Sequence, residues 1–430
     1  MASRNEEVPG SRRGELQALA CNRSYVALWV GQTVSWIGNA FHRISLLFLL
    51  MEGVPRASQH VPLLLLMLVH AAAHLAIGPF AGVVVDRWSR KAAMIAADLA
   101  RAGLVLLIPF AAGLAGHFWL YALSFLVTVA SLFFEPARHS ALPQVVGEKE
   151  IFLANSILAT SESVAELVGL VAGGLFISRL GYRAAFFFDA FSFLISALAV
   201  ALMTFQVAPV RQAAAWREEL GQVLGDLRQG FAYVRRRVDI RALFGLFFLL
   251  AMAVGSVNYL LATFTKAGLG LGPEAYAVID AGIVAGYVLG SVAVAAAGSG
   301  WNRIAMLGLG LFGMGAGNVV IAQSHHLPLA VAGGVIGGLF NPVYYVASRT
   351  YMQETVANEV LGRVFSLQFL VVQLGFVASV LLASVCLPWL GLRAWLFWSG
   401  AGLALVGILA PQTGVLGRLR RGEAVVSSRA

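Results

Sequence analysis

The sequence has 430 residues, of which 59% are hydrophobic and only 12% are charged. This composition excludes an ordinary soluble protein, in which about a quarter of the residues are charged. The formal net charge is +9, but we find no soluble domain that could present a basic and aromatic surface, so the charge does not indicate a nucleic-acid partner.

Twelve apolar stretches follow one another along the chain, and each is long enough to cross a bilayer as a helix. The first six are predicted at Tyr25–Leu50, Val61–Val85, Ala92–Ala115, Phe118–Pro136, Phe152–Ser178 and Ala184–Phe205. The second six are predicted at Ala242–Thr265, Ala275–Ala297, Ile304–Ala322, Leu327–Ser348, Val364–Leu387 and Ala394–Ala410. The predicted fold is an all-α polytopic membrane protein with twelve transmembrane helices in two pseudo-symmetric six-helix bundles.

The basic residues set the orientation of these spans. If both termini are inside, the tails and inner loops hold 23 of the 30 Lys and Arg residues. The positive-inside rule then places both termini on the cytoplasmic side of the plasma (cell inner) membrane. The first 23 residues have no apolar core of a signal peptide, so we expect none to be cleaved. The expected parts are a tail (1–23), a first bundle (24–206), a connector (207–240), a second bundle (241–411) and a tail (412–430).

The connector is the one long polar stretch between predicted spans. Within Pro209–Asp239, apolar residues recur at helical spacing and charged residues occupy the other faces, which predicts an amphipathic helix along the inner membrane surface. We interpret it as a tether that orients the two bundles, and a regulatory partner site is the alternative.

Charged side chains within spans are costly and mark functional sites. Asp98 and Arg101 lie three residues apart on the third span and can neutralise each other, either as a structural ion pair or as a coupling element. Glu162 and Glu166 lie four apart on the fifth span, so they share a face. Both cannot comfortably be ionised, so we expect one to carry a proton and the pair to couple transport to protons. The alternative is that Glu166 only pairs with a base.

Other polar residues in the spans are secondary candidates. Arg43 on the first span is expected to attract an anionic group or to hold one of the acids. Asp280 is a further coupling candidate, and Asp189 is expected to help pack Ser192 and the helix ends. His70 and His74 lie four apart, but no third metal ligand is in view, and neither cysteine has the spacing of a metal site. We therefore expect no metal and no cofactor.

Between the second and third spans the sequence reads Gly82-Val-Val-Val-Asp86-Arg87-Trp-Ser-Arg90-Lys91. This segment resembles the loop signature G-x-x-x-D-R-x-x-R-[RK] of the major facilitator superfamily at every defined position. A second segment, Phe133-Phe-Glu-Pro-Ala-Arg-His-Ser-Ala-Leu-Pro143, is similar to the fourth-to-fifth-span region of the drug-proton antiporter branch. That branch includes macrolide exporters, the enterobactin exporter and the lysophospholipid transporter.

The resemblance implies that Asp86 and Arg87 latch the inner gate against the opposite half, within a gating set that also includes Gly82, Arg90, Lys91 and Arg138. Asp86 ends a helix, where the backbone dipole disfavours an anion, so it should be held by a partner such as Arg138 or the segment near Asn358 and Glu359. The alternative interpretation is a solvated run of charges that sets topology. The corresponding loop at Gly298–Arg303 lacks the acid.

Two further positions bear on the resemblance. The segment Gly169-Leu-Val-Ala-Gly-Gly174 is similar to the G-P-x-x-G-G element of exporters, but Leu170 replaces the proline, and generic small-residue packing is the alternative. Family members often carry an acid in the first span where this chain has Asn39, which cannot titrate. Proton coupling would therefore need another carboxylate.

The predicted function is secondary active efflux of a lipophilic or amphipathic small molecule by alternating access, with the proton as coupling ion and a monomer as the unit. The resemblance implies a cavity between the first, fourth, seventh and tenth spans. Its candidate lining residues combine aromatic surface with hydrogen-bonding and charged groups: Asn39, Phe41, Arg43, Phe134, Glu135, Asn258, Tyr259, Phe340, Asn341, Tyr344 and Tyr345.

Two other functions were weighed. A lysophospholipid flippase, or a siderophore exporter of the same superfamily, would fit a lipid-like substrate, and a zwitterionic head group would favour Arg43 with Glu135 or Glu162. An enzyme is not expected, because the chain has no P-loop, no Ser/His/Asp motif in a suitable loop and no metal constellation.

Overall fold

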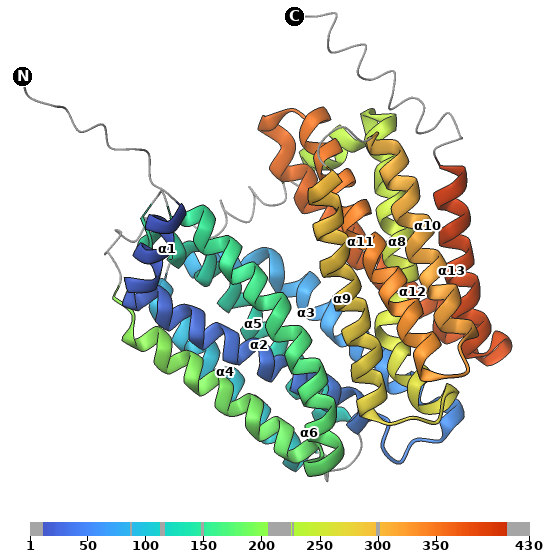
Figure 1. The fold of residues 1–430 in the computed structure, drawn as a ribbon, viewed down its shortest axis with the longest axis horizontal. Helices are drawn as coiled ribbons and strands as arrows, with labels where there is room; N and C mark the ends of the chain where they lie inside the picture. Colours follow the sequence, from blue (N-terminus) through green and yellow to red (C-terminus); the bar gives the residue numbers. More distant parts are fainter. Residues whose placement is uncertain are drawn as a thin grey trace, which may run out of the picture. The chain divides into compact units, whose positions relative to one another are not determined.

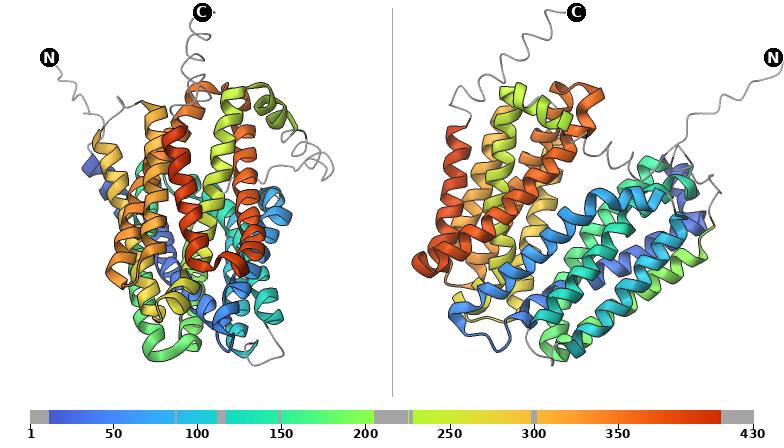
Figure 2. Two further views of the ribbon diagram at one scale, coloured as in Figure 1. Left: turned by 90° about the vertical axis from the view of Figure 1, so that its right-hand side faces the viewer. Right: turned by 180° about the vertical axis from the view of Figure 1, so that it is seen from behind.

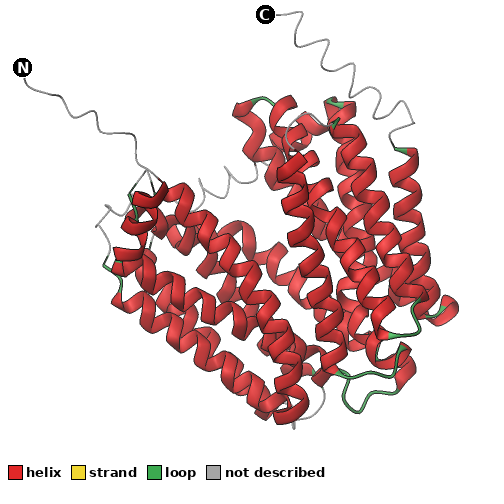
Figure 3. Cartoon of the chain, viewed as in Figure 1, coloured by secondary structure: helices red, strands yellow, loops and turns green. Residues whose placement is uncertain are grey.

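The computed structural model describes residues 12–86, 88–111, 117–147, 150–204, 225, 228–297 and 302–410. Within these ranges every regular element is a helix, as Figure 3 shows. Ten of the described helices are long and apolar enough to cross a membrane. The predicted all-α membrane fold is therefore confirmed.

The first half of the chain begins with six helices (Figure 1). They are α1 (Arg12–Cys21), α2 (Arg23–Leu50), α3 (His60–Asp86), α4 (Arg90–Ala111), α5 (Phe118–Val145) and α6 (Ile151–Leu202), with the short helix η1 (Arg56–Ser58) between α2 and α3. The predicted inner loop is short, because α3 ends at Asp86 and α4 begins at Arg90.

Helix α6 contains the fifth and sixth predicted spans. Its apolar stretch Leu153–Leu202 has 50 residues, which would be about 75 Å long as one straight helix, more than twice the thickness of a bilayer core. Gly181 interrupts it with φ 79° and ψ 171°, a backbone conformation that glycine adopts without steric cost. The chain therefore reverses direction at Gly181.

The second half consists of α8 (Val238–Thr263), the π-helix η2 (Phe264–Gly268), α9 (Pro273–Ala297), α10 (Arg303–Gln323), α11 (Leu327–Thr355), α12 (Asn358–Leu390) and α13 (Leu392–Leu409). Helix α10 packs against α11 and α13, α11 against α9, and α12 against α8. Figure 2 shows these helices side by side in one bundle. The count of twelve spans stays a prediction, because α2, whose 28 residues include Gln32, Asn39 and Arg43, is not among the ten.

Two helices run further than the hydropathy pattern predicts. We expected the fourth span to end at Pro136 and the tenth at Ser348, but α5 continues to Val145 and α11 to Thr355. Pro136 and Pro143 both lie inside α5. A proline removes one helical hydrogen bond and can bend a helix without ending it.

The described chain forms two compact units. Unit 1 contains residues 1–45, 76–169 and 180–214, and unit 2 contains residues 46–75, 170–179 and 215–430. The end of α2, the beginning of α3 and the middle of α6 thus belong to unit 2. The division into two six-helix bundles at the connector stays a prediction.

Close backbone packing holds α11 within unit 2. A Cβ atom on Gly338 would lie 2.0 Å from the Ile283 carbonyl oxygen of α9, and one on Gly317 of α10 would lie 2.4 Å from the Gly337 nitrogen. No side chain fits at such distances, so these glycines permit the helices to touch directly.

Most of the predicted connector helix lies outside the described residues. Residues 228–236 are helical, and Val234 is part of the hydrophobic core of unit 2. Arg237 then bonds Asp239 of α8 through Nε at 2.9 Å, and Tyr351 of α11 donates to Asp239 at 3.2 Å. The Tyr351 hydrogen bond therefore fixes the end of the connector to α11, and the Arg237–Asp239 ion pair was not predicted.

Candidate functional site

Unit 1 gathers five charged residues of α2, α5 and α6, which we call the charged cluster: Arg43, Glu135, Arg138, Glu162 and Glu166. Arg43 Nη2 lies 3.0 Å from Glu166 Oε1. Arg138 Nη2 donates to Glu135 Oε2 at 2.6 Å. Glu162 is one turn before Glu166, within electrostatic range of Glu166, Glu135 and Arg138. Bases thus alternate with acids across three helices.

The charged cluster is accessible although it lies deep in apolar helices. The side chains of Arg43 and Glu166 are 42% and 40% exposed, and that of Glu135 is 49% exposed. Glu166 is 15 residues into α6, which is about 22 Å along the helix axis. Charged groups at membrane depth face a bundle interior or a water-filled cavity, so this surface of unit 1 is suited to bind ions or polar groups. Glu166 does pair with a base, as one of the two alternatives supposed.

Asp98 and Arg101 form an ion pair of a different kind, buried inside unit 1. Asp98 is 0% exposed and Arg101 5% exposed, and Arg101 donates to Asp98 within α4. The Arg101 guanidinium also lies 4.3 Å from the ring centres of Phe134 and Phe193. This burial favours the structural alternative, because no part of the pair is open to a substrate.

The sequence analysis missed a second buried pair, between α2 and the part of α6 after Gly181. His42 Nδ1 lies 3.0 Å from Asp189 Oδ2, and the Ser192 hydroxyl donates to the Asp189 carbonyl oxygen at 2.7 Å. The Asp189–Ser192 contact is the one expected. The partner His42 is adjacent in sequence to Arg43 but on another face of α2, which periodicity alone does not reveal.

The predicted gating residues have different surroundings. Lys91 Nζ donates to the carbonyl oxygens of Ala201 and Met203 at 2.7 Å, which satisfies acceptors at the end of α6. Arg90 begins α4, and the Arg138 guanidinium lies 5.9 Å from the Trp36 ring centre. The latch stays a prediction, because Arg87 and the side chains of Asp86, Asn358 and Glu359 lie outside the described residues.

Unit 2 contains a small, mainly apolar cavity with four polar side chains in its wall, which we call the amide pocket. It has a volume of about 200 Å³ and is lined by α8, α9, α10 and α11. Asn258 and Asn341, both predicted to contact substrate, lie on its wall, together with Asn318 and Tyr287, which the sequence analysis missed. A single asparagine within an apolar span gave too little signal to select Asn318.

Several aromatic residues predicted to line a cavity are packing residues. Tyr344 is 3% exposed and meets Phe247 edge to face, in the core of unit 2. Phe134 and Phe41 are 1% and 4% exposed, and Phe41 stacks on Phe188. In this structure the three rings pack among other side chains, where a large ring gains most from burial, and their role in lining a substrate cavity stays a prediction.

The remaining candidates are partly open. Phe340 is partly buried against the core of unit 2, Tyr345 is 43% exposed below the guanidinium of Arg349, and Asn39 is exposed. Tyr259 is half-buried, and Asp280 accepts a hydrogen bond from Tyr276 at 3.3 Å. Asp280 therefore has a neutral partner on its own helix.

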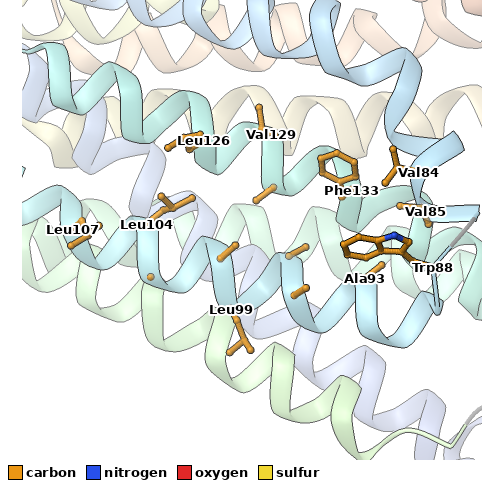
Figure 4. Close-up of a pocket in the computed structure, with 15 residues that line it drawn as sticks. Val84, Val85, Trp88, Ala93, Leu99, Leu104, Leu107, Leu126, Val129 and Phe133 are labelled. Carbon is orange, nitrogen blue, oxygen red and sulfur yellow. The ribbon is translucent and has the colours of Figure 1, made fainter. Parts of the chain in front are cut away.

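An apolar groove runs along α4 and α5 in unit 1 (Figure 4). Its volume is about 710 Å³, and Val84, Trp88, Leu104, Leu126 and Phe133 are among its lining residues. Trp88 lies at the end where α3 stops, with Val84, Val85 and Phe133 around it. Apart from the indole N–H of Trp88, the lining side chains offer no hydrogen-bonding group, so the groove can accept hydrocarbon.

Two other predicted features have local explanations. A Cβ atom on Gly169 would lie 2.8 Å from Cβ of Ala40 in α2, and one on Gly174 would lie 2.5 Å from Cβ of Ala277 in α9, so the small residues of α6 permit close helix packing. His74 Nδ1 lies 2.9 Å from the carbonyl oxygen of His70. Among the described residues, no group of three His, Cys, Asp or Glu could hold a metal ion.

Apolar helices with an accessible charged surface in one unit and a cavity with polar side chains in the other are features expected of a membrane transporter. Residues 28–301 match the Major Facilitator Superfamily. The chain belongs to this superfamily, as its loop signature predicted.

Relatives and solved structures agree with this assignment. Macrolide efflux protein A of Streptococcus pyogenes is 24% identical over 402 residues, which are 92% of this chain and 97% of that protein. The putative bacilysin exporter BacE of Bacillus subtilis (strain 168) is 26% identical over 292 residues, 67% of this chain and 71% of that protein. A bacterial homologue of the lysosomal transporter Spinster has a TM-score of 0.65 at 16% identity, covering 96% of this chain and 98% of that chain. A peptide transporter of the POT family has a TM-score of 0.72 at 14% identity, covering 95% and 99%.

Proposed function

We propose that this chain is a secondary active exporter that couples the efflux of a lipophilic or amphipathic small molecule to proton entry. The observation that carries the proposal is the charged cluster of unit 1. Carboxylates at this depth that remain accessible can exchange protons with a water-filled path. The efflux proteins named among the relatives support export over uptake.

Within the charged cluster we assign the proton to Glu162. Glu166 has Arg43 at 3.0 Å and Glu135 has Arg138 at 2.6 Å, whereas Glu162 forms no ion pair within the described residues. The nearby acids Glu135 and Glu166 oppose its negative charge. Protonation of Glu162 would remove that repulsion, and a cationic or amphipathic substrate could take the place of the proton.

The proposal also includes the inner gate, the oligomeric state and the orientation in the membrane. Asp86 and Arg87 would latch the inner gate, with Arg138 and the segment near Asn358 and Glu359 as partners. The chain would act as a monomer in the plasma (cell inner) membrane, with both termini and the connector in the cytoplasm. Its partners would be a small-molecule or lipid-like substrate, the proton as coupling ion and membrane lipid, with no nucleic acid.

A lysophospholipid flippase is the second candidate, and the apolar groove of unit 1 favours it. With about 710 Å³ the groove lies in the size range of sites for drug-sized ligands, and its lining matches an acyl chain. Arg43 and Glu135 offer both signs of charge to a zwitterionic head group.

Efflux from cells that express the chain separates the two candidates. The panel should include ethidium, erythromycin, an iron-free siderophore and a fluorescent lysophosphatidylethanolamine, each with and without a protonophore. Protonophore-sensitive efflux of ethidium or erythromycin supports the exporter. Movement of the lysolipid alone supports the flippase, and movement of no probe above empty-vector cells contradicts both.

A further inference from the structure

We propose that the amide pocket is a recognition subsite for an uncharged hydrogen-bonding group of the substrate, such as a hydroxyl, a lactone carbonyl or an amide. The inference rests on the proposed function for its role in export. It assigns a substrate class to unit 2, whereas the proton chemistry was assigned to unit 1.

Asn318 lies at the wall of the amide pocket with little exposure to solvent. The residue is only 8% exposed, it lines the amide pocket, and within the described part of the chain its amide makes no hydrogen bond. The amide is therefore open to the pocket, and polar groups in such a place are nearly always hydrogen-bonded to water or to a ligand. A ligand group or ordered water in the pocket would satisfy it.

Uncharged hydrogen-bonding groups line the wall of the pocket. Asn258, Asn318 and Asn341 each supply both a donor and an acceptor, and Tyr287 adds a hydroxyl. Pro342 has no N–H, so it removes the helical donor for the carbonyl oxygen of Gly338, which also lines the pocket. No charged residue is among the lining groups. The wall therefore suits neutral groups that both donate and accept, and it offers nothing to balance an ion.

The pocket is also small and stiff. Its volume of about 200 Å³ is below the range of about 300–1,000 Å³ that holds a drug-sized ligand, so only one end of an amphipathic molecule fits. Gly338 lies directly against α9, and Gly317 of α10 against Gly337. If these helices separated or slid, they would lose the close backbone contacts. The pocket is therefore largely preformed, and it selects its ligand by shape.

Asn318→Leu tests the inference, because leucine keeps the branching and the number of heavy atoms of the side chain and removes its hydrogen bonds. The matched control is Met306→Leu, which makes a well-tolerated apolar exchange on the same helix, in the core of unit 2 and outside the lining of the pocket. Both variants and the wild type would be purified into lipid nanodiscs. Two probes would be compared: erythromycin, which carries hydroxyl and carbonyl groups, and tetraphenylphosphonium, a lipophilic cation with no hydrogen-bonding group.

The inference predicts that Asn318→Leu weakens erythromycin binding about tenfold, as expected for the loss of one or two neutral hydrogen bonds. Tetraphenylphosphonium binding should stay within about twofold, and Met306→Leu should leave the binding of both probes unchanged. The Tm of the ligand-free Asn318→Leu variant should be close to that of the wild type, because the amide makes no hydrogen bond within the described part of the chain that the variant could lose.

Each contrary outcome has a distinct meaning. Equal loss for both probes together with a lower Tm would make Asn318 a structural residue and overturn the inference. Unchanged erythromycin binding in Asn318→Leu would mean that the pocket holds water only. A wild type that binds tetraphenylphosphonium but not erythromycin also overturns it, whereas a wild type that binds neither contradicts the proposed function itself.

Discussion

Arg43 of α2 and Glu166 of α6 meet at 3.0 Å, with side chains 42% and 40% exposed. An ion pair this accessible contributes at most about 1 kcal/mol to stability. Its place deep in apolar helices is therefore better explained by transport than by folding.

Exchanging the two charges tests whether transport needs the ion pair itself or each charge at its own position. Glu166→Gln is expected to reduce transport several-fold while the Tm changes little, since the exposed pair adds little stability. The double variant Arg43→Glu with Glu166→Arg should recover part of the lost rate, measured as initial efflux at equal membrane content. If neither variant alters the rate, the pair has no role in transport.

Asp98 and Arg101 should behave in the opposite way. Removing one member leaves a buried charge without its partner, which costs about 3–5 kcal/mol, so Arg101→Met and Asp98→Leu should each lower the Tm strongly. The double variant should recover most of the stability, as read from thermal unfolding in detergent. A stable Arg101→Met variant that cannot transport would instead make this pair part of the coupling machinery.

The fold was largely predictable because hydropathy reports directly on membrane insertion. The helices lie where the apolar stretches do, and the errors fall at Pro136 and Ser348, where polar residues continue a helix that hydropathy had ended. We expected a short loop between the fifth and sixth spans, but Gly181 alone separates them. The sequence does not show that one residue is enough to turn the chain.

The candidate site was only partly predictable, because charge stands out in an apolar sequence and polarity without charge does not. The charged residues of unit 1 were found, including the acids now placed near Arg43 and Arg138. Asn318 and His42 were missed, since their importance comes from neighbours on other helices. Tyr344 and Phe134 were selected for their aromatic character, which does not distinguish core from cavity.

The inner loop offers a third prediction. Asp86→Asn should reduce transport at least tenfold without affecting insertion, because a charge-assisted contact worth about 1.5–3 kcal/mol is lost and the gate would favour its inward-open state. Asp86→Glu is the matched control that keeps the charge. Normal transport by Asp86→Asn, with the protein at equal abundance in the membrane, would reduce the loop to a topology signal.

Topology gives a fourth prediction, and the structure improves its test. Ser324 and Gln59 lie in predicted outer loops but are 0% and 5% exposed, so a cysteine there would report burial. His325 is exposed and is the better outer site, with Gln222 as the connector site, in a background where Cys21 and Cys386 are serine. An impermeant maleimide should label His325→Cys and not Gln222→Cys in intact cells. The reverse pattern would invert the proposed orientation.

Proton-driven export through the charged cluster is most directly tested in proteoliposomes that contain only this protein. A pH gradient would be imposed, and the accumulation of a substrate found in the efflux panel would be measured for the wild type and for Glu162→Gln. The matched control is Glu354→Gln, because Glu354 pairs with Arg303 at 3.2 Å in unit 2, away from the charged cluster. The account predicts uphill accumulation by the wild type and the control, its collapse on addition of a protonophore, and its absence in Glu162→Gln, which should still bind substrate. If Glu162→Gln accumulates as much substrate as the wild type, and the protonophore still abolishes that accumulation, the assignment of the proton to Glu162 is contradicted. If accumulation survives the protonophore, proton coupling itself is contradicted.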